Sequence, residues 1–215
     1  MMLSAETDSR KAGTVWVLNL DEPTEGITPL VAATFRQAGA GSASALVQAM
    51  QLDSPAEIYR RFEAGQRCYT AWVGGELASY GWVSFDRELV GELRLRLQLL
   101  PGEAYIWDCC TLPSYRQNRL YSALLAYTLA ELRSGPLCRA WIGASRENLA
   151  SQQGIARAGF HRVADLTVTR MLALRQVGVL AQPNVPETLV EEVRRVFLGN
   201  RNKIWLEALA MVKRY

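Results

Sequence analysis

The first third of the chain contains one strand-like run followed by several runs with helical spacing. Residues Thr14–Leu20 combine β-branched, aromatic and apolar side chains before an Asp-Glu-Pro stop, which predicts a strand. In Ile27–Ala38 apolar residues recur at helical spacing before a Gly-Ala-Gly-Ser break, which predicts a helix, and a short helix follows over Ser44–Gln51. Residues 54–57, Ser-Pro-Ala-Glu, combine a capping serine, a first-turn proline and a capping-box glutamate, so another helix begins there and ends near Gly65.

In the middle of the chain the period of the apolar side chains changes to two. Cys68–Val73 and Glu76–Phe85 flank a Gly-Gly pair, which predicts a β-hairpin whose turn uses the positive φ angles that glycine tolerates. Leucines alternate with polar residues over Leu93–Leu99, which indicates a strand with one wet face. We expect a Pro-Gly turn to pair it with the next strand, Ala104–Thr111, which is too apolar for an edge and should be central.

The second half of the chain alternates helices with strands and ends in a segment of different composition. A helix over Ser114–Ser134 carries an apolar stripe and ends at a Gly-Pro pair. The elements expected after it are a strand at Leu137–Gly143, a helix from the cap Asn148 to Gly159, a strand at Leu166–Leu174, and amphipathic helices at Glu187–Leu198 and Lys203–Arg214. This order predicts an α+β domain with a mixed sheet at residues 14–174, followed by a helical extension at residues 175–215.

Composition and charge narrow the class of protein without naming a partner. The 215 residues are 49% hydrophobic and 21% charged, as in globular proteins, and a net charge of +3 is too small to indicate a nucleic-acid binder. Four cysteines are too few for a disulfide framework, and the adjacent pair Cys109–Cys110 cannot bridge without strain, which indicates reduced thiols. The single histidine, His161, excludes a multi-histidine site, so no bound metal is expected. No secretory or membrane-spanning segment is recognisable. We therefore expect a cytoplasmic protein that binds neither nucleic acid nor a membrane.

The chemically informative segment surrounds the end of the predicted central strand. Residues Tyr105–Ser122, YIWDCCTLPSYRQNRLYS, form a buried strand, a proline, a loop with two arginines and a helix start. A helix N-terminus presents about four unpaired backbone N–H groups and about half a positive charge. With Arg116 and Arg119 beside it, this helix start could hold a diphosphate. The alternative is that both arginines are solvated surface side chains.

This segment and two later ones resemble one known family. Residues 115–125, YRQNRLYSALL, are similar to the acyl-CoA signature R-x-x-G-x-G/A of the GNAT acetyltransferase superfamily, which follows a strand and opens a helix. The strand Leu137–Gly143 followed by Asn148 and Ser151 resembles the asparagine-bearing strand and helix of that superfamily. Residues 157–160, RAGF, are similar to the end of that helix. The three matches occur in the order that the family has.

The chain departs from the signature at two positions, where the family has glycine at the first and glycine or alanine at the second; glycine there lets phosphates approach the backbone. Arg119 occupies the first of these positions, and Tyr121 occupies the second. Arg119 can point outward from the helix start while its backbone N–H still donates. We therefore expect a phosphate site of somewhat altered geometry.

The resemblance implies a GNAT-like acyl-CoA N-acyltransferase fold, in which the central parallel strands splay apart and the co-substrate acetyl-CoA inserts between them. The thioester carbonyl would accept a hydrogen bond from a backbone N–H near Cys109 or Cys110, which polarises the carbon for attack. The implied cofactor-binding residues are Cys109, Cys110, Thr111, Leu112, Arg116, Gln117, Asn118, Arg119, Leu120, Tyr121, Ser122, Asn148 and Ser151.

The resemblance also raises the question of which group protonates the departing thiolate. Family members often have a tyrosine four residues before the glycine of the final G-F pair, and this chain has Ile155 there. Ser151, Tyr121 or water would then act instead, or the thiolate would leave unaided. The candidate catalytic residues are Asp108 and Ser151.

The attacking amine must lose a proton, so a base is needed as well. Asp108 on the central strand is the candidate, with Glu103 behind it. The alternative for Asp108 is a buried carboxylate that pairs with Arg139. The adjacent Cys109 and Cys110 could indicate a nucleophile, but no histidine or acid is tied to them by sequence, which favours a role in core packing.

The functional hypothesis is an N-acetyltransferase that moves an acetyl group from acetyl-CoA to a primary amine of a small molecule or peptide by direct attack in a ternary complex. A non-catalytic acyl-CoA-binding sensor, and an aminoacyl or longer-chain acyltransferase, are alternatives on the same fold. The sequence does not specify the acceptor. The apolar faces of the two C-terminal helices need to be covered, which a homodimer would do.

Overall fold

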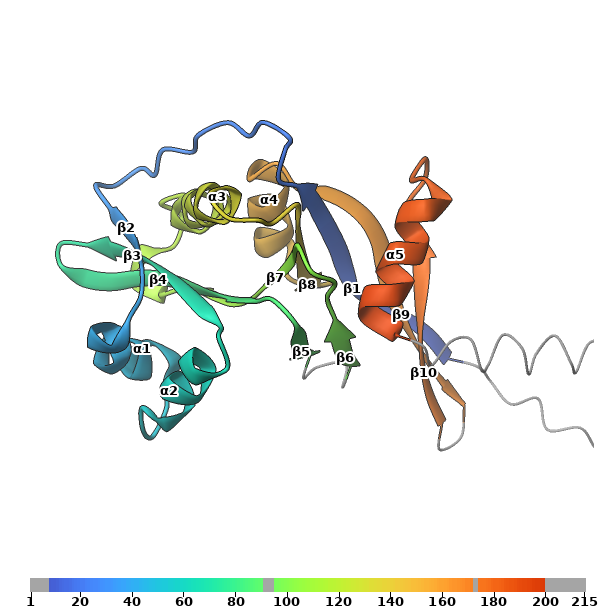
Figure 1. Cartoon of the computed structure of the whole chain (residues 1–215), viewed down its shortest axis with the longest axis horizontal. Helices are drawn as coiled ribbons and strands as arrows, with labels where there is room; N and C mark the ends of the chain where they lie inside the picture. Colours follow the sequence, from blue (N-terminus) through green and yellow to red (C-terminus); the bar gives the residue numbers. More distant parts are fainter. Residues whose placement is uncertain (1–7, 91–94, 172–173, 200–215) are drawn as a thin grey trace, which may run out of the picture.

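A mixed sheet of eight strands organises the computed structural model, which describes residues 8–90, 95–171 and 174–199 (Figure 1). In chain order its strands are β1 (Asp8–Asn19), β2 (Thr34–Gln37), β3 (Arg67–Val73), β4 (Glu76–Ser84), β7 (Glu103–Thr111), β8 (Arg139–Ser145), β9 (His161–Met171) and β10 (Leu174–Ala181). Their spatial order is β10-β9-β1-β8-β7-β4-β3-β2, with β7 and β8 parallel and the other neighbours antiparallel. The predicted α+β class is confirmed, and β7 is central as its apolar sequence predicts.

Helices cover both faces of the sheet because its strands carry apolar side chains on both sides. They are α1 (Ala43–Met50), α2 (Ala56–Glu63), α3 (Leu120–Arg133), α4 (Leu149–Arg157) and α5 (Glu187–Leu198). On β1, Trp16 and Leu18 belong to the cluster beneath α3 and α4, whereas the intervening Val15 and Val17 pack with side chains of α5. Helices α1 and α2 lie across the sheet from α3, beside β3 and β4 (Figure 1).

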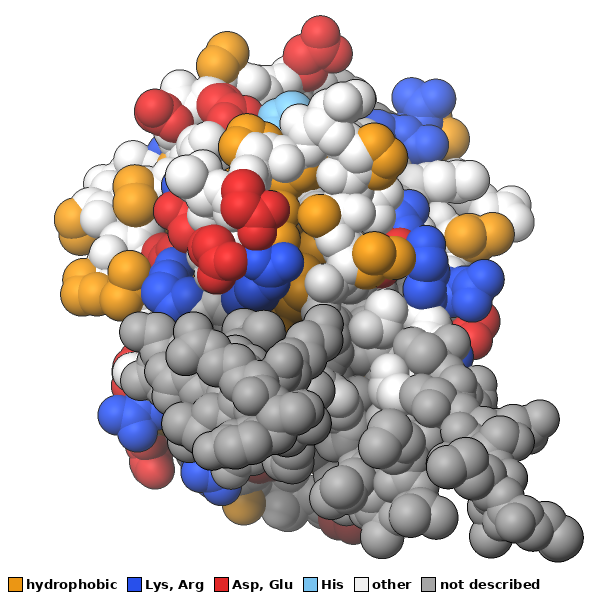
Figure 2. Space-filling model, turned by 90° about the vertical axis from the view of Figure 1, so that its right-hand side faces the viewer, with side chains coloured by type: hydrophobic (Ala, Val, Ile, Leu, Met, Phe, Trp, Pro, Cys, Tyr) orange, Lys and Arg blue, Asp and Glu red, His pale blue; other side chains and the backbone are white. Residues whose placement is uncertain are grey.

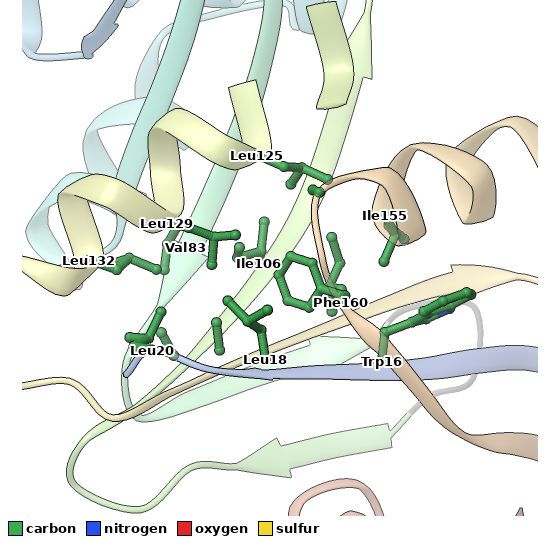
Figure 3. Packing of buried hydrophobic residues seen from close by; sticks show 14 of the residues in the cluster. Trp16, Leu18, Leu20, Val83, Ile106, Leu125, Leu129, Leu132, Ile155 and Phe160 are labelled. Atoms are coloured by element: carbon green, nitrogen blue, oxygen red, sulfur yellow. The ribbon is translucent and has the colours of Figure 1, made fainter. Parts of the chain in front are cut away.

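The core beneath α3 and α4 determines where the start of α3 stands relative to the end of β7. Leu125 and Leu129 of α3 lie over Ile106 of β7 and Leu18 of β1, and each of these side chains is at most 2% exposed (Figure 3). Burying one such side chain stabilises the fold by about 1.5–3 kcal/mol. This packing therefore holds the helix start beside the strand end, where the chemically informative segment lies.

Helix α5 is attached to the sheet by apolar side chains and by ion pairs. Phe197 is buried, and Arg195 donates a 2.6 Å hydrogen bond to Glu103 of β7. Figure 2 shows acidic and basic side chains intermixed on the side of the molecule that carries α5. The helix predicted over Glu187–Leu198 is confirmed, while the helix predicted over Lys203–Arg214 lies outside the described residues.

The helix predicted over Ile27–Ala38 is wrong. Only residues Thr34–Gln37 form a regular element, the edge strand β2, which pairs antiparallel with β3. Leu30 is 61% exposed, and Phe35 instead stacks on Tyr127 of α3 with ring centroids 5.7 Å apart. Backbone pairing with β3 and this aromatic contact are long-range interactions, which outweigh a local apolar periodicity of four residues.

The predicted hairpin between Leu93–Leu99 and the central strand does not form. Strand β6 (Leu95–Gln98) pairs with β5 (Arg87–Val90) in a separate two-stranded sheet, and Leu93 lies outside the described residues. Leu97 and Leu99 are buried in the cluster that includes α5. The leucine side of the strand is thus covered by a helix rather than by extension of the sheet.

Several local predictions are confirmed. Gly74 and Gly75 join β3 to β4 with φ angles of 59° and 86°, as the turn requires. The two helices predicted before this hairpin are α1 and α2. The Asn148 side chain caps α4 by accepting the Ser151 backbone N–H at 3.0 Å.

The end of the sheet differs from its prediction. The strand predicted at Leu166–Leu174 begins earlier, at His161, and the chain then turns back as β10 to pair with β9. Strand β10 is the edge of the sheet and leads to α5. Across the described ranges, every helix is too short or too polar to cross a lipid bilayer.

Candidate active site

Strands β7 and β8 pair only along their first halves. Residues Glu103–Ile106 face Arg139–Ile142 in parallel register, whereas β7 continues to Thr111 and β8 to Ser145 without further pairing between them. The predicted splay of the two central strands is therefore present. Beyond Ile106 the backbone N–H and C=O groups of β7 and β8 no longer form hydrogen bonds with each other. Two pockets open at this point.

A β-bulge interrupts β7 at the point where the strands part. Between the pairs Trp82–Trp107 and Tyr80–Cys110, two residues of β7 oppose a single residue of β4. Asp108 is the extra residue, and its φ angle of 43° lies in the left-handed region. The bulge reverses the alternation of side chains, so that residue 109 faces α3 and α4, and Cys110 faces α1 and α2.

The carboxylate of Asp108 is bound by an arginine from α2. Arg61 is only 8% exposed, and its Nη1 donates to Asp108 Oδ2 at 2.6 Å while its Nε donates to Glu57 Oε1 at 2.8 Å. The guanidinium carbon lies 4.9 Å from the ring centroid of Trp82 and 4.5 Å from that of Trp107. Two ion pairs and two cation–π contacts therefore hold Arg61, and through it the Asp108 carboxylate, in one position.

Helix α3 begins at Leu120 rather than at Ser114. Residues Pro113–Tyr115 form a single 3-10 turn, and Gln117 and Arg119 then adopt left-handed φ angles of 65° and 58°. The first glycine position of the acyl-CoA signature is thus a position where the backbone is left-handed, a conformation that costs a non-glycine residue about 1–2 kcal/mol. Arg119 adopts it nonetheless.

A basic pocket of about 720 Å³ lies between the start of α3 and the face of α4. Its charged lining residues are Arg116, Arg119 and Arg157, and it has no acidic lining residue within the described part of the chain. All of the predicted cofactor-binding residues line it except Leu112 and Asn118. The Asn118 amide instead donates to two carbonyl groups of its own loop at 3.2 Å, so it supports the loop from within.

An acidic pocket of about 540 Å³ adjoins the basic pocket on the β7 side. Its charged lining residues, over the ranges that the structure describes, are Glu88 and Asp108. The two pockets share four lining residues, Cys109, Tyr121, Asn148 and Ser151. A cleft with basic side chains at one end and carboxylates at the other is suited to hold an anion and a cation against a common wall.

Two hydroxyl groups lie in this common wall. The Ser151 hydroxyl donates to the Tyr121 phenol oxygen at 3.2 Å, and burial raises the pKa of Tyr121 above its ordinary value. The Tyr121 ring lies directly against Gly154, where a Cβ atom would approach the ring to 2.4 Å. Ile155 points into the core instead (Figure 3), with no exposed surface, so the position of the usual family tyrosine does not face the cleft.

The alternative in which Asp108 pairs with Arg139 is wrong. Arg139 forms an ion pair with Glu192 of α5, whereas the partner of Asp108 comes from α2. The second candidate base, Glu103, lies at the opposite end of β7 and is 5% exposed. Burial opposes its ionisation, but hydrogen bonds from Arg195 and a backbone N–H outweigh burial and lower the pKa of Glu103. Glu103 therefore helps to hold α5 against the sheet.

The two adjacent cysteines are not poised as nucleophiles. Burial raises the pKa of both the Cys109 and the Cys110 thiol, so both are protonated at neutral pH. The Cys109 sulfur lies where a side chain on Gly81 would be, 2.9 Å from an added Cβ, and thus fills space opposite the bulge.

Sequence reasoning missed two charged residues that line the cleft, Glu88 and Arg157, and also Arg61, which binds Asp108 from behind the cleft wall. Arg157 could have been found, because Ser151, residue 154 and Arg157 recur every three positions and share one face of α4. No local signal indicates the other two residues. Arg61 reaches Asp108 from 47 positions away, and Glu88 belongs to a strand outside the main sheet.

A sheet that opens between its central parallel strands, beside a basic helix start, is the arrangement that the resemblance to acyl-CoA transferases implies. The family model described as Acetyltransferase (GNAT) family matches residues 46–160, more than half of the chain. The chain therefore belongs to the acetyltransferase (GNAT) family. Acetyl-CoA is the co-substrate of that family.

Solved structures share the fold at low sequence identity. A GNAT-family acetyltransferase from Colwellia psychrerythraea superposes with a TM-score of 0.55 at 15% identity, over 81% of this chain and 57% of that chain. A GCN5-related N-acetyltransferase from Sphaerobacter thermophilus gives 0.52 at 12%, over 84% and 55%. A GNAT-family protein from Novosphingobium aromaticivorans gives 0.51 at 16%, over 76% and 66%. This chain thus spans less than two thirds of each of them, and no curated protein matches its sequence.

Proposed function

We propose that this protein transfers the acetyl group of acetyl-CoA to a primary amine, which attacks the thioester directly in a ternary complex. The observation that carries the proposal is the opposite charge of two joined pockets, arginines in one and carboxylates in the other. A diphosphate is an anion and an ammonium group is a cation, so the two need binding residues of opposite charge. The wall that the pockets share, with the Tyr121 and Ser151 hydroxyls, is where donor and acceptor would meet.

The basic pocket holds the donor in this proposal. The diphosphate accepts hydrogen bonds from backbone N–H groups of the first turn of α3, which have no partner within the helix, and from Arg116 and Arg119. Arg157 approaches from α4. The pantetheine arm follows β7 where β8 no longer pairs with it, and the thioester oxygen accepts an N–H from Cys109 or Cys110. Such a donor contributes about 2.7–4 kcal/mol to the transition state.

Asp108 is the proposed base. Its ion pair with Arg61 uses Oδ2, so Oδ1 is the carboxylate oxygen that would accept the proton. The carboxylate lines the acidic pocket and stands one residue before Cys109, whose backbone N–H is a proposed partner of the thioester. A proton can therefore leave the amine toward Asp108, directly or through one water, as the new bond forms.

Tyr121 and Ser151 together are the proposed acid. Because Ser151 donates its hydroxyl hydrogen to the Tyr121 oxygen, the phenol hydrogen is available for a third group. Burial raises the pKa of Tyr121, so the phenol is protonated at neutral pH. This pair would supply from α3 and α4 the proton that Ile155 lacks, and a general acid typically accelerates a reaction by about 10²–10⁴-fold.

Two measurements on the purified chain test this proposal. Calorimetric titration with acetyl-CoA should show binding, and CoA thiol release should depend on added primary amine. Asp108→Asn and Tyr121→Phe should each lower kcat by about 10²-fold or more, with little effect on acetyl-CoA affinity. Asp86→Asn, at an acid that is 74% exposed outside the pockets, is the matched control.

Binding of acetyl-CoA without thiol release across a broad amine panel would contradict the proposal and favour a non-catalytic sensor. A donor preference for a longer or aminoacyl thioester over acetyl-CoA would contradict only the identity of the acyl group.

A further inference from the structure

The acidic pocket contains a carboxylate that the proposed mechanism does not use. Its charged lining residues within the described ranges are Asp108, the proposed base, and Glu88 of β5. The pocket wall also includes the aromatic residues Tyr105, Trp107 and Phe197. Aromatic faces favour alkyl chains and organic cations. Asp108 is already paired with Arg61, and Arg60 interacts with Glu88 only through the Coulombic field, so Glu88 is the carboxylate of the wall that a ligand cation would pair with.

Glu88 is held in place by three neutral donors. Its Oε2 accepts hydrogen bonds from Gln66 Nε2 at 2.8 Å and Ser84 Oγ at 2.5 Å, and its Oε1 accepts the Leu89 backbone N–H at 2.9 Å. Among the residues with described positions, no lysine, arginine or histidine nitrogen lies within 4.0 Å of it, whereas Asp108 has a guanidinium partner. The negative charge of Glu88 is therefore positioned but not neutralised by a direct ion pair, which a ligand cation would provide.

A hydrogen-bond chain links Glu88 to the strand that carries Asp108. Trp107 Nε1 donates to Ser84 Oγ at 2.8 Å, and the Ser84 hydroxyl donates to Glu88. Ser84 is only 1% exposed, so this link is sheltered from water. Because Trp107 directly precedes Asp108, the two carboxylates are held at a set separation within one pocket.

We infer that the acceptor is a diamine-type dication, which reacts at one nitrogen and binds Glu88 through the other, an ammonium group. The inference rests on the proposed function, since it takes the acidic pocket as the acceptor site. The reacting nitrogen first gives one proton to water and, as a neutral amine, forms a bond to the acetyl carbon as the C–S bond breaks. It then passes a second proton to Asp108, while the departing sulfur takes the phenol proton of Tyr121 and leaves as CoA thiol. Asp108 returns its proton to Tyr121 through water, so one proton is released to solvent in each cycle. The ammonium group on Glu88 keeps its protons throughout.

Charge at the distal end of the acceptor should therefore decide selectivity. An amino alcohol of equal length leaves Glu88 without a cation, and an ω-amino acid brings a third carboxylate into the pocket. Hydrogen bonds between charged groups are about twice as strong as neutral ones, which predicts that kcat/KM for the diamine exceeds that for the amino alcohol about tenfold or more.

The test uses the full chain at saturating acetyl-CoA and follows CoA thiol release. The acceptors are α,ω-diamines of graded length, with the amino alcohol and the ω-amino acid that match each one. At the best length we expect the diamine to be the most reactive and the amino acid the least. In Glu88→Gln the ratio of diamine to amino alcohol should fall to near unity, whereas Asp86→Asn, two positions away and outside the pocket, should keep the wild-type ratio.

An amino alcohol as reactive as its diamine, or a ratio that Glu88→Gln leaves unchanged, would overturn the inference. Calorimetric titration of the CoA-bound protein with the best diamine repeats the test without turnover, and Glu88→Gln should weaken that binding about tenfold. Thiol release with many amines but no preference for diamines would remove this inference and leave the proposed function standing. Failure to bind acetyl-CoA would instead remove the proposed function.

Discussion

The guanidinium of Arg61 lies 2.6 Å from the carboxylate of Asp108, although the two residues are 47 positions apart and belong to elements on different layers. Asp108 stands at a bulge with left-handed backbone, where the strand alone does not determine the direction of its side chain. Helix α2 therefore acts as a support of the cleft. Contacts with the rings of Trp82 and Trp107 leave the guanidinium little freedom to move away.

Replacing Arg61 should lower the free energy of unfolding and also disturb the position of Asp108, the proposed base. Arg61→Met removes a charged hydrogen bond from a partly buried carboxylate, so we expect the free energy of unfolding to fall by about 2 kcal/mol. Urea unfolding measures the change, and Arg60→Met, an exposed neighbour that also pairs with Glu57, is the control. A double-mutant cycle with Asp108→Asn should give a coupling energy, and simple additivity would contradict a direct interaction.

The contact between Tyr121 and Gly154 predicts that Gly154→Ala lowers the free energy of unfolding of the wild type but raises that of a Tyr121→Ala variant. In the wild-type background, Gly154→Ala places a Cβ atom 2.4 Å from the ring and should destabilise the fold by about 1–3 kcal/mol. In the Tyr121→Ala background the same substitution should stabilise α4 by about 1 kcal/mol, because alanine is the better helix former. Urea unfolding of the four proteins measures both values. Equal effects in the two backgrounds would mean that the ring does not occupy this place.

Left-handed backbone at residue 119 predicts that glycine is preferred there over alanine. Arg119→Ala and Arg119→Gly both remove the charge, but only glycine adopts a φ of 58° without a steric cost. The glycine variant should be the more stable of the two by about 1 kcal/mol. Thermal or urea unfolding of the matched pair tests this, and a more stable alanine variant would contradict the backbone conformation. Both variants should bind acetyl-CoA more weakly than the wild type.

The lowered pKa of Glu103 predicts how the free energy of unfolding depends on pH. Its pKa in the folded chain is lowered from the ordinary value of 4.5, so its contribution is fully present above that pH and is lost as the pH falls through the lowered value. Glu103→Gln should be less stable than the wild type at neutral pH, since Arg195 loses its carboxylate partner. The difference should shrink as the pH falls below about 4.5. Urea unfolding across this range measures it, and a constant difference would show that the carboxylate charge is not involved.

Replacing Arg157 should change the affinity for the donor, acetyl-CoA, and leave the acceptor pocket unaffected. Arg157→Gln should weaken acetyl-CoA binding about tenfold, because an arginine–phosphate contact is a charge-assisted one. The loss should be smaller at high salt, where the wild-type contact is itself screened. Calorimetry at two salt concentrations tests this, with Arg96→Gln, an exposed arginine of β6 outside the basic pocket, as the control. An affinity unchanged at low salt would exclude Arg157 from the donor site.

Elements whose signals are local could be predicted, and elements that depend on distant partners could not. The β3–β4 hairpin follows from Gly74 and Gly75, and the start of α4 follows from the cap Asn148. The segment predicted as a helix over Ile27–Ala38 has an apolar periodicity, but its only regular element is Thr34–Gln37, whose backbone pairs with β3. Leu97 likewise alternates as a sheet residue should, yet is covered by α5. The periodicity of a segment shows that one face of it is apolar, but it does not show which other element covers that face.

The sequence by itself determined the fold class, the family and the presence of arginines ahead of α3, because glycine pairs and the order of short motifs act over a few positions. It did not determine the residue at which α3 begins, which is Leu120 and not Ser114. Only the tertiary structure decided which charges face the cleft. It brought Arg61 to Asp108, placed Glu88 in the acidic pocket and turned Ile155 into the core. These relationships depend on a bulge and on packing between layers, and the long-range contacts that create them leave no periodic trace along the chain.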